Sequence, residues 1–447
     1  MKKLYAGFSR ADMTPPLGIN LDGFGKDRPA DGIIDRLYIN TLVLSDGSKT
    51  AAIIVLDTCN LPHNLDEWID YISKECGIKS SGVSVIATHT HYGPALDIGP
   101  YSAPQGDENY NNRLREIMVS TVKSAIDDEK PVISIRHGET TVPDTTYSRR
   151  WKLKNGTYDT HLDSITREMV EGPACEIDET MRLVRLIRRD AKDIVLLNFS
   201  THPCNLRGGN MISAEYPGIV RTRVESAIPE SQCVFFTGFA GQLIGFDERA
   251  PKERKKGPDM TVAVKIGERL ADAAFSLYGS ASETDTGGFE FYKEYIQVKT
   301  KLEYKSLEEC AEIIELMHNG KEDTVREKYH AKPGRLLFEA TSVLRLYEKK
   351  EYTKTLPVTV IGLGGVAIVG LPGEPFCEFG TYIRKNSPFD CTLTCEMVNA
   401  APGYIPTKEA YEQGGYEPLN TELAKGGGEM LRDAAAAILD RCKTEIN

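Results

Sequence analysis

Apolar and polar positions follow two different spacings along the first hundred residues. Two β-branched apolar runs, 38–44 and 50–56, are separated by a short polar turn and predict a β-hairpin. Apolar positions then recur with helical spacing over 65–76, and the run 83–87 predicts the next strand. A strand, a helix and a strand in this order form a βαβ unit, whose two strands we expect to be parallel.

The same alternation continues to the end of the chain, and no internal repeat, low-complexity block or flexible linker interrupts it. Further strands are predicted at 132–137, 181–188, 194–199, 233–236 and 289–304, with two more over 357–371. Further helices are predicted at 108–127, from residue 216 onward, at 260–277, in most of 307–349 and at 421–442. We therefore expect residues 1–447 to form a single α/β domain of layered mixed β-sheets flanked by helices.

The composition narrows the class of protein. With 40% hydrophobic and 27% charged residues, the chain is typical of a soluble globular protein. The formal net charge of -11 would repel phosphate backbones, so nucleic acid is not an expected partner. The longest apolar run, 358–371, contains four glycines and is shorter than the roughly 20 residues that cross a bilayer.

The cysteines and the N-terminus suggest a compartment. The 10 cysteines are scattered without a CxxC motif, and we interpret them as buried free thiols rather than a disulfide framework. The first residues lack the apolar core of a signal peptide. Both observations predict a cytoplasmic protein.

Three of the eight histidines stand where predicted strands end. His89 and His91 follow the strand 83–87, and His202 follows the strand 194–199. Ligand sites of open α/β sheets gather at the carboxyl ends of the strands. If strand geometry persists, His89 and His91 point to the same face, because they are two residues apart. Such a set could give zinc two nitrogen ligands and leave one imidazole as a proton carrier.

Two carboxylates could contribute to the same site. Glu374 follows a glycine turn at the mouth of a predicted helix and could supply an oxygen ligand. Asp57 could orient an imidazole or merely cap its strand, and a second metal near it is left open. Each residue also has an ordinary alternative. The HxH motif of His89 and His91 could occur by chance, and His202 could be a hydrogen-bonded loop residue. Glu374 could simply be a charge near a helix N-terminus. The glycine-rich hairpin at 362–365 lacks a following helix and a Lys-Ser/Thr pair, so a nucleotide site is not expected.

Seven motifs, taken in sequence order, are more specific than any one of them. They are AGFSRADMTPPLG (6–18), THTHYGP (88–94), NFSTHPCNL (198–206), ISAEYPG (212–218), TGFAGQ (237–242), LPGEPFCEFG (371–380) and GYIPTKEAYEQGGYE (403–417). In this order they resemble the neutral/alkaline non-lysosomal ceramidase family, over essentially the whole chain. The resemblance implies a layered α/β catalytic domain and a zinc amidase that cleaves the N-acyl bond of ceramide.

The resemblance also implies a role for individual residues. The implied zinc ligands are His89, His202, Glu374 and Tyr404, with Tyr411 and Tyr416 as alternatives in the same loop for the phenolic ligand. The implied catalytic residues are His91 and Arg149, and the implied substrate-binding residues are Arg149, Gly241 and Tyr416. Zn²⁺ would activate a water molecule and polarise the carbonyl, while His91 and Arg149 would stabilise the oxyanion and protonate the leaving nitrogen.

The chain departs from the family pattern at two points. Ile244 stands in Gly241-Gln242-Leu243-Ile244-Gly245-Phe246, where ceramidases carry their catalytic serine. We also expect no C-terminal immunoglobulin-like domain. The sequence therefore predicts a zinc-dependent hydrolase that cleaves an amide or related acyl bond of a small polar substrate with metal-activated water. Two alternatives remain: a neutral ceramidase (N-acylsphingosine deacylase) that uses water alone, and a catalytically inactive metal-binding protein. The oligomeric state is left open.

Overall fold

The apolar runs form the strands of two main sheets in the computed structural model, which describes residues 3–98, 104–162, 164–250, 257–303, 305–329 and 333–446. The larger sheet consists of β1 (Tyr5–Asp12), β3 (Tyr38–Ser45), β4 (Thr50–Leu56), β5 (Val83–Ala87), β6 (Lys130–Thr141), β11 (Thr180–Arg188), β12 (Asp193–Phe199), β14 (Ser231–Thr237) and β16 (Ser282–Thr284). Its strand order is β14-β12-β11-β6-β1-β3-β4-β5, and β16 pairs with β6. The smaller sheet has the order β17 (Phe289–Lys299), β18 (Thr353–Leu363), β19 (Val366–Gly370) and β21 (Cys391–Cys395).

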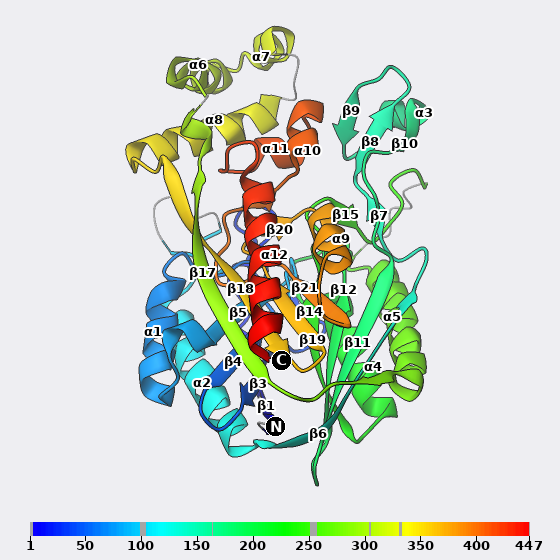
Figure 1. The fold of residues 1–447 in the computed structure, drawn as a ribbon. Coiled ribbons are helices and arrows are strands. Elements are labelled where there is room, and N and C mark those ends of the chain that lie inside the picture. Colours follow the sequence, from blue (N-terminus) through cyan, green and yellow to red (C-terminus); the bar gives the residue numbers. More distant parts are fainter. Residues whose placement is uncertain are drawn as a thin grey trace.

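The two sheets pack face to face, and helices cover their outer faces (Figure 1). The covering helices are α1 (Leu65–Cys76), α2 (Glu108–Asp127), α4 (Glu215–Ala227) and α5 (Thr261–Ser280) on the larger sheet, and α9 (Cys377–Lys385) and α12 (Gly427–Ile446) on the smaller one. In β4, Ile54 and Leu56 pack against the helices, while Ile53 and Val55 face the smaller sheet. Each such burial contributes about 1.5–3 kcal/mol. The four layers confirm the predicted α/β class.

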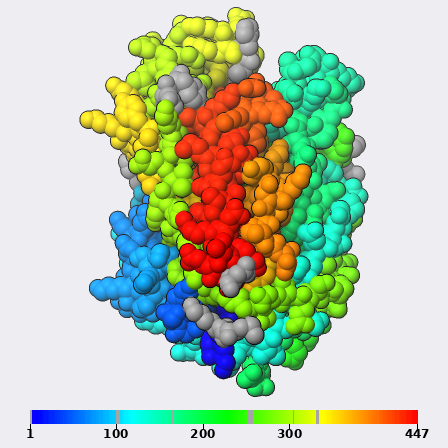
Figure 2. Space-filling view, in the orientation of Figure 1, coloured from blue at the N-terminus to red at the C-terminus, as the bar shows by residue number. Residues whose placement is uncertain are grey.

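Figure 2 shows α12 running over the smaller sheet, between β17 and α9. The other described elements are short or lie outside the two sheets. They are β2 (Gly32–Ile33), β7 (Tyr147–Ser148), β8 (Arg150–Leu153), β9 (Tyr158–Thr160), β10 (Val170–Pro173), β13 (Met211–Ile212), β15 (Leu243–Ile244), β20 (Glu374–Pro375), β22 (Tyr404–Ile405), α3 (Ser164–Glu168), α6 (Leu307–His318), α7 (Glu322–Tyr329), α8 (Pro333–Glu348), α10 (Lys408–Gln413), α11 (Tyr416–Leu419) and the 3₁₀ turns Ser80–Gly82 and Lys301–Glu303. Among the described helices, none is both long and apolar enough to cross a membrane.

Most predicted elements are confirmed, and the exceptions have local causes. The βαβ unit is present, with β4 and β5 parallel. The strand predicted over 289–304 ends at Lys299, because the next residue, Thr300, bridges to Leu423 and a 3₁₀ turn follows; Tyr304 lies outside the described residues. The last helix begins at Gly427 rather than at residue 421, because Gly426 adopts a φ of +94°. All ten cysteines are free, as predicted, but only six of them are buried.

The segment that follows β21 joins the two opposite edges of the larger sheet. The backbone N–H of Glu396 donates to the carbonyl of Thr237, at the end of β14 (3.1 Å). Asn399 exchanges hydrogen bonds with the backbone of Val85 in β5, both of 2.9 Å. The hydroxyl of Thr237 also donates to the carbonyl of Thr88 (2.6 Å). The carboxyl ends of β4, β5, β12, β14, β19 and β21 therefore face one region of the molecule.

Two additions flank this region at the end of the molecule opposite both termini (Figure 1). One is an arm formed by β7 to β10 and α3, and the other is the charged helical unit α6 to α8, in agreement with the helices predicted over 307–349. The two touch through Arg335 of α8, which pairs with Asp159 (3.4 Å) and donates to the carbonyl of Thr160.

Candidate active site

Three side chains from three different strand ends meet at one point. His89 follows β5, His202 follows β12, and Glu374 begins β20 beyond the end of β19. The Nε2 atoms of His89 and His202 are 3.1 Å apart, and Oε2 of Glu374 lies 3.4 Å from the first and 3.0 Å from the second. The ligand atoms of a tetrahedral zinc site, about 2.0–2.2 Å from the metal, stand roughly 3.3–3.6 Å from one another. The observed spacing therefore fits a metal centre.

Hydrogen bonds determine which nitrogen of each imidazole faces this point. Nδ1 of His89 lies 2.8 Å from the carbonyl of Cys59, and Nδ1 of His202 lies 2.9 Å from the carbonyl of Ala240. A carbonyl only accepts hydrogen bonds, so Nδ1 carries the proton in each ring, and a neutral ring turns the lone pair of Nε2 toward Glu374. Oε2 of Glu374 is buried without a hydrogen-bond partner among the described residues. Three electron-pair donors that converge in this way fit a bound cation.

Charge and burial set the protonation of the cluster. Burial raises the pKa of Glu374, but the neighbouring imidazoles, His89 first, bring it well below its ordinary value. Burial lowers the pKa of His89, but Cys59 and Glu374 raise it well above the usual range. Burial and the charge of Arg149 lower the pKa of His202 to about 4. The cluster thus favours positive charge at this point, which either a proton on His89 or a metal ion supplies.

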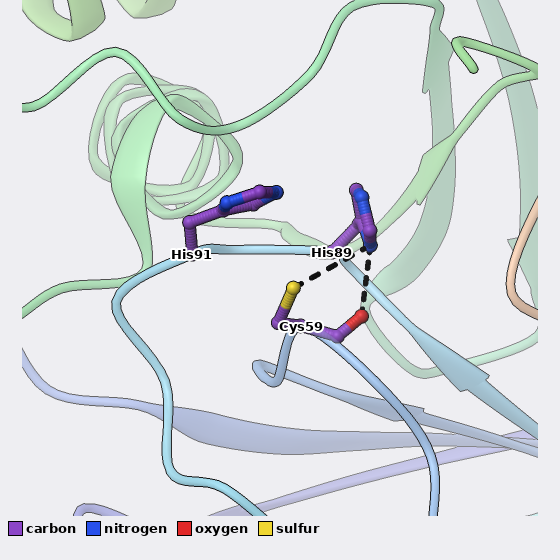
Figure 3. A group of neighbouring side chains, drawn as sticks. All are labelled: Cys59, His89 and His91. Carbon is purple, nitrogen blue, oxygen red and sulfur yellow. Dashed lines mark hydrogen bonds between the residues drawn. The ribbon is translucent and has the colours of Figure 1, made fainter. Parts of the chain in front are cut away.

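His91 lies beside this cluster but outside it. Its ring centroid is 5.0 Å from that of His89 and 5.5 Å from that of His202. The strand geometry on which the expectation for His89 and His91 depended does not persist, because the strand ends at Ala87 and His89 adopts a φ of +66°. This turn, and not the strand, brings both rings to one side of the backbone (Figure 3). Burial and the two neighbouring histidines hold the pKa of His91 well below 6.5.

A loop that the sequence did not single out closes over His91. Gly23 has a φ of +104°, and a Cβ built there would lie only 2.4 Å from Nδ1 of His91, so only glycine fits. The ring of Phe24 packs edge-on against His91 (5.0 Å), and Arg28 donates to the His91 carbonyl (2.6 Å). The loop therefore excludes water from one side of the imidazole.

Arg149 is held by buried protein groups. Its Nε donates to Oε1 of Glu417 (2.9 Å), and Arg150 donates to Oε2 of the same carboxylate (2.8 Å). Nη2 of Arg149 donates to the carbonyl of Gly241. A Cβ on Gly241 would lie 2.3 Å from the carbonyl oxygen of Glu374, so this close approach requires glycine. The predicted substrate-binding role of Gly241 stays a prediction, since its carbonyl is used to hold Arg149.

The structure separates the three candidate tyrosines. Tyr404 is buried and lies beside Glu374 in the parallel register of β20 and β22. Cζ of Arg149 is 5.0 Å from the ring of Tyr404 and 5.7 Å from that of Tyr416. Tyr411 instead donates its hydroxyl to the carbonyl of Leu423 (2.7 Å). Tyr404 is thus the best placed of the three beside the carboxylate ligand, and Tyr416 lies next to Arg149.

Asp57 and Ile244 have clear structural roles. Asp57 accepts two hydrogen bonds from Arg221 (2.9 and 2.6 Å) and one from the backbone of Tyr38 (2.9 Å), so it forms a buried ion pair at the end of β4 and contacts no imidazole of the described residues. The candidate metal-ligand groups among the described residues do not include it. Ile244 is buried and pairs with Tyr147 across β15 and β7, two residues before Arg149.

Glu396, which the sequence did not single out, acts on the site through the backbone of Ala240. Its Oε2 accepts the backbone N–H of Ala240 (2.9 Å), the same residue whose carbonyl accepts Nδ1 of His202. Glu396 is fully buried, and burial raises its pKa to about 8. Its one sequence signal is a carboxylate in the apolar stretch from Cys395 to Val398. The chain brings this carboxylate to the site only because the segment after β21 joins the sheet edges.

Comparisons with known proteins agree with this architecture. The family model described as neutral/alkaline non-lysosomal ceramidase, N-terminal, matches residues 4–247, more than half of the chain. The fold is similar to that of neutral ceramidase from Pseudomonas aeruginosa, with a TM-score of 0.72, 16% identity, and 99% of this chain and 75% of that chain covered. It is also similar to a structure described as a ceramidase complexed with C2, with a TM-score of 0.70, 16% identity, and 99% and 76% covered.

Proposed function

The chain belongs to the neutral/alkaline non-lysosomal ceramidase family of hydrolases, and we propose that it is a zinc-dependent hydrolase that cleaves an amide or related acyl bond of a small polar substrate. The observation that carries the proposal is the convergence of His89, His202 and Glu374. Their ligand atoms lie within 4.8 Å of one another, and all three residues are buried. Two imidazoles and a carboxylate are the donor set of many catalytic zinc sites.

In this proposal His89, His202 and Glu374 hold the ion, and Tyr404 is a further oxygen ligand because it adjoins Glu374 in the register. The ion, when bound, would polarise the scissile carbonyl and activate a water molecule as the nucleophile. The carbonyl groups of Cys59 and Ala240 keep both histidines in the tautomer that ligation needs.

His91 and Arg149 perform the remaining steps. His91 is neutral near pH 7, and both of its ring nitrogens lack partners among the described residues, so Nε2 or Nδ1 can take a proton and return it to the leaving group. The Arg149 guanidinium is fixed by Glu417 and Gly241 before substrate arrives. A fixed cation beside the reacting carbonyl would stabilise negative charge on its oxygen.

Ile244 is the basis for the choice of substrate. The buried aliphatic side chain of Ile244 stands where the family carries its serine hydroxyl. Ile244 pairs with Tyr147, which precedes Arg149 by two residues. The hydroxyl contact that the serine would make is therefore lost, and we propose that the chain acts on acyl compounds smaller and more polar than ceramide. Ceramide hydrolysis with water alone is the second candidate, favoured by the fold similarity over 99% of the chain.

The test is a panel of short N-acyl compounds and esters beside micellar ceramide, assayed as purified, after chelation and after zinc is restored. We expect at least one soluble substrate to be hydrolysed only with metal, and ceramide to be cleaved much more slowly. Ceramide cleaved as fast as the best soluble compound would favour the second candidate. No turnover by protein shown to hold zinc would contradict both and leave a metal-binding protein.

A further inference from the structure

A second group of potential metal ligands lies on the other side of His89. Sγ of Cys59 is 3.8 Å from Nδ1 of His89, and one ring nitrogen of His91 completes a set whose atoms all lie within 4.8 Å of one another. Figure 3 shows the thiol pointing toward the gap between the two imidazoles. In a tetrahedral zinc site a sulfur and a nitrogen ligand stand about 3.6 Å apart. The spacing of Cys59 and His89 is close to that value.

His91 gives an independent indication of a ligand at this place. The residue is only 8% exposed, yet Nδ1 and Nε2 are both buried without a hydrogen-bond partner among the described residues. Buried polar atoms of this kind nearly always have a partner in folded proteins. A metal ion bound by one of these nitrogens would give that nitrogen a partner and would lie next to the Cys59 thiol.

We propose that Cys59, His89 and His91 bind a second metal ion of soft or borderline character, such as Cd²⁺ or Zn²⁺, with His89 shared between two ions. Thiolate and imidazole favour such metals over Mg²⁺ or Ca²⁺. The inference rests on the proposed function, because the first ion occupies Nε2 of His89 and the second takes Nδ1. In this proposal, the second metal that the sequence left open near Asp57 is bound by Cys59, two residues later in the chain.

The proton balance makes the second site the weaker one. Binding there requires the thiol of Cys59 and Nδ1 of His89 to release their protons. It also breaks the hydrogen bond from His89 to the Cys59 carbonyl. The first site needs neither change, so we expect it to fill first and the second to fill only in excess metal. Because the second ion occupies a nitrogen of His91, we also expect excess zinc to inhibit turnover.

Cobalt titration tests the inference, since thiolate ligation to Co²⁺ gives a strong near-ultraviolet absorption that imidazole and carboxylate ligands do not. We expect the full chain to bind about one tight Co²⁺ without this absorption, and a second, weaker ion with it. Cys59→Ser should keep the tight ion and lose the second ion together with the absorption. Cys204→Ser is the matched control, because Cys204 lies two residues from His202 but joins no ligand group among the described residues.

The outcomes separate the two proposals. A tight ion with no second ion and no thiolate absorption would overturn only the second site. The same absorption in Cys59→Ser would also overturn it, since another thiol would then be the ligand. Failure to bind any ion would overturn the proposed function itself. Elemental analysis of the wild type and Cys59→Ser in excess zinc checks the number of bound ions without cobalt.

Discussion

The two sides of the site, which we call the sheet wall (His89 and His202) and the arm wall (Arg149, Arg150 and Glu417), are built in different ways. On the sheet side, His89 and His202 follow strand ends, and backbone carbonyl groups fix their rings. On the arm side, Arg149 and Arg150 converge on one buried carboxylate, Glu417, which is the hub of that wall. The sheet wall positions electron-pair donors through the core of the fold, whereas the arm wall positions positive charge through a few side chains. Metal binding should therefore withstand changes in the arm wall, which chiefly alter charge and stability.

The largest effect is expected from Glu374→Ala. Without the carboxylate, the two imidazoles and Tyr404 remain of the proposed ligands, and none of them is an anionic carboxylate, so we expect tight zinc binding and metal-dependent hydrolysis to be lost together. Glu378→Ala is the matched control, because Glu378 is a half-buried carboxylate four residues later in the chain whose partner is Gln242. Elemental analysis and turnover of the best panel substrate are the measurements. Zinc retained by Glu374→Ala at the wild-type level would remove Glu374 from the ligand set.

His91→Ala should separate chemistry from metal binding. We expect kcat to fall by about 10²–10⁴-fold, the usual contribution of general acid–base catalysis, with the tight zinc retained. The reason is that neither nitrogen of His91 has a hydrogen-bond partner among the described residues, while its ring lies outside the His89, His202 and Glu374 cluster. If this variant lost its tight zinc, His91 would be a ligand of the first ion.

Glu417→Gln tests the arm wall. The variant leaves two buried guanidinium groups without their carboxylate, so we expect a loss of about 3–5 kcal/mol in the free energy of unfolding. Zinc bound to the folded protein should remain. Chemical denaturation of wild type and variant measures the first effect, and Glu412→Gln in the same loop, whose partner is the exposed Lys425, should change little. Equal stability of the two variants would show that Glu417 is not the hub.

The pH dependence of this effect has a definite sign. Burial raises the pKa of Glu417, but the charges of Arg149 and Arg150 lower it below the ordinary 4.5. A carboxyl group whose pKa is depressed in the folded state stabilises the protein above its unfolded pKa. The difference between wild type and Glu417→Gln should therefore be full above about pH 4.5 and shrink as the pH falls further. A difference that grew on acidification would contradict the assignment.

A smaller effect is expected behind the sheet wall. Glu396→Leu removes the acceptor for the N–H of Ala240, whose carbonyl orients His202, so zinc affinity should fall by about 10–100-fold. Glu396→Gln keeps an oxygen acceptor and should restore most of the affinity. Competition with a chelator of known affinity measures both. Loss of affinity in Glu396→Gln equal to that in Glu396→Leu would contradict a role for the hydrogen bond between Glu396 and Ala240.

Sequence patterns predicted the sheet wall better than the arm wall. Apolar runs that end in polar residues located His89 and His202 correctly, because a strand end fixes where the next side chains lie. The geometry of His89 and His91 was not predictable, since it depends on a φ of +66° that alternation does not encode. The residues of the arm carry no strong periodicity, and the elements over 147–173 were not predicted.

The support residues escaped prediction for a different reason. Cys59 and Glu396 stand in apolar stretches, where a thiol is most simply a core residue and a carboxylate has no visible partner in sequence. Their roles arise from contacts with residues that are 30 and 156 positions away, His89 and Ala240. Such contacts follow from how the sheet edges are joined, which no local pattern contains.

The most direct test of the metal centre is zinc per chain after dialysis in limiting metal, measured for wild type, His89→Ala, His202→Ala and His91→Ala. We predict about one zinc in wild type and in His91→Ala, and almost none in the other two variants, because His89 and His202 are the histidines of the described chain that turn a nitrogen toward Glu374. Circular dichroism of each variant checks that the fold is kept. Equal zinc in all four proteins, or none in any, would contradict the assignment of the site.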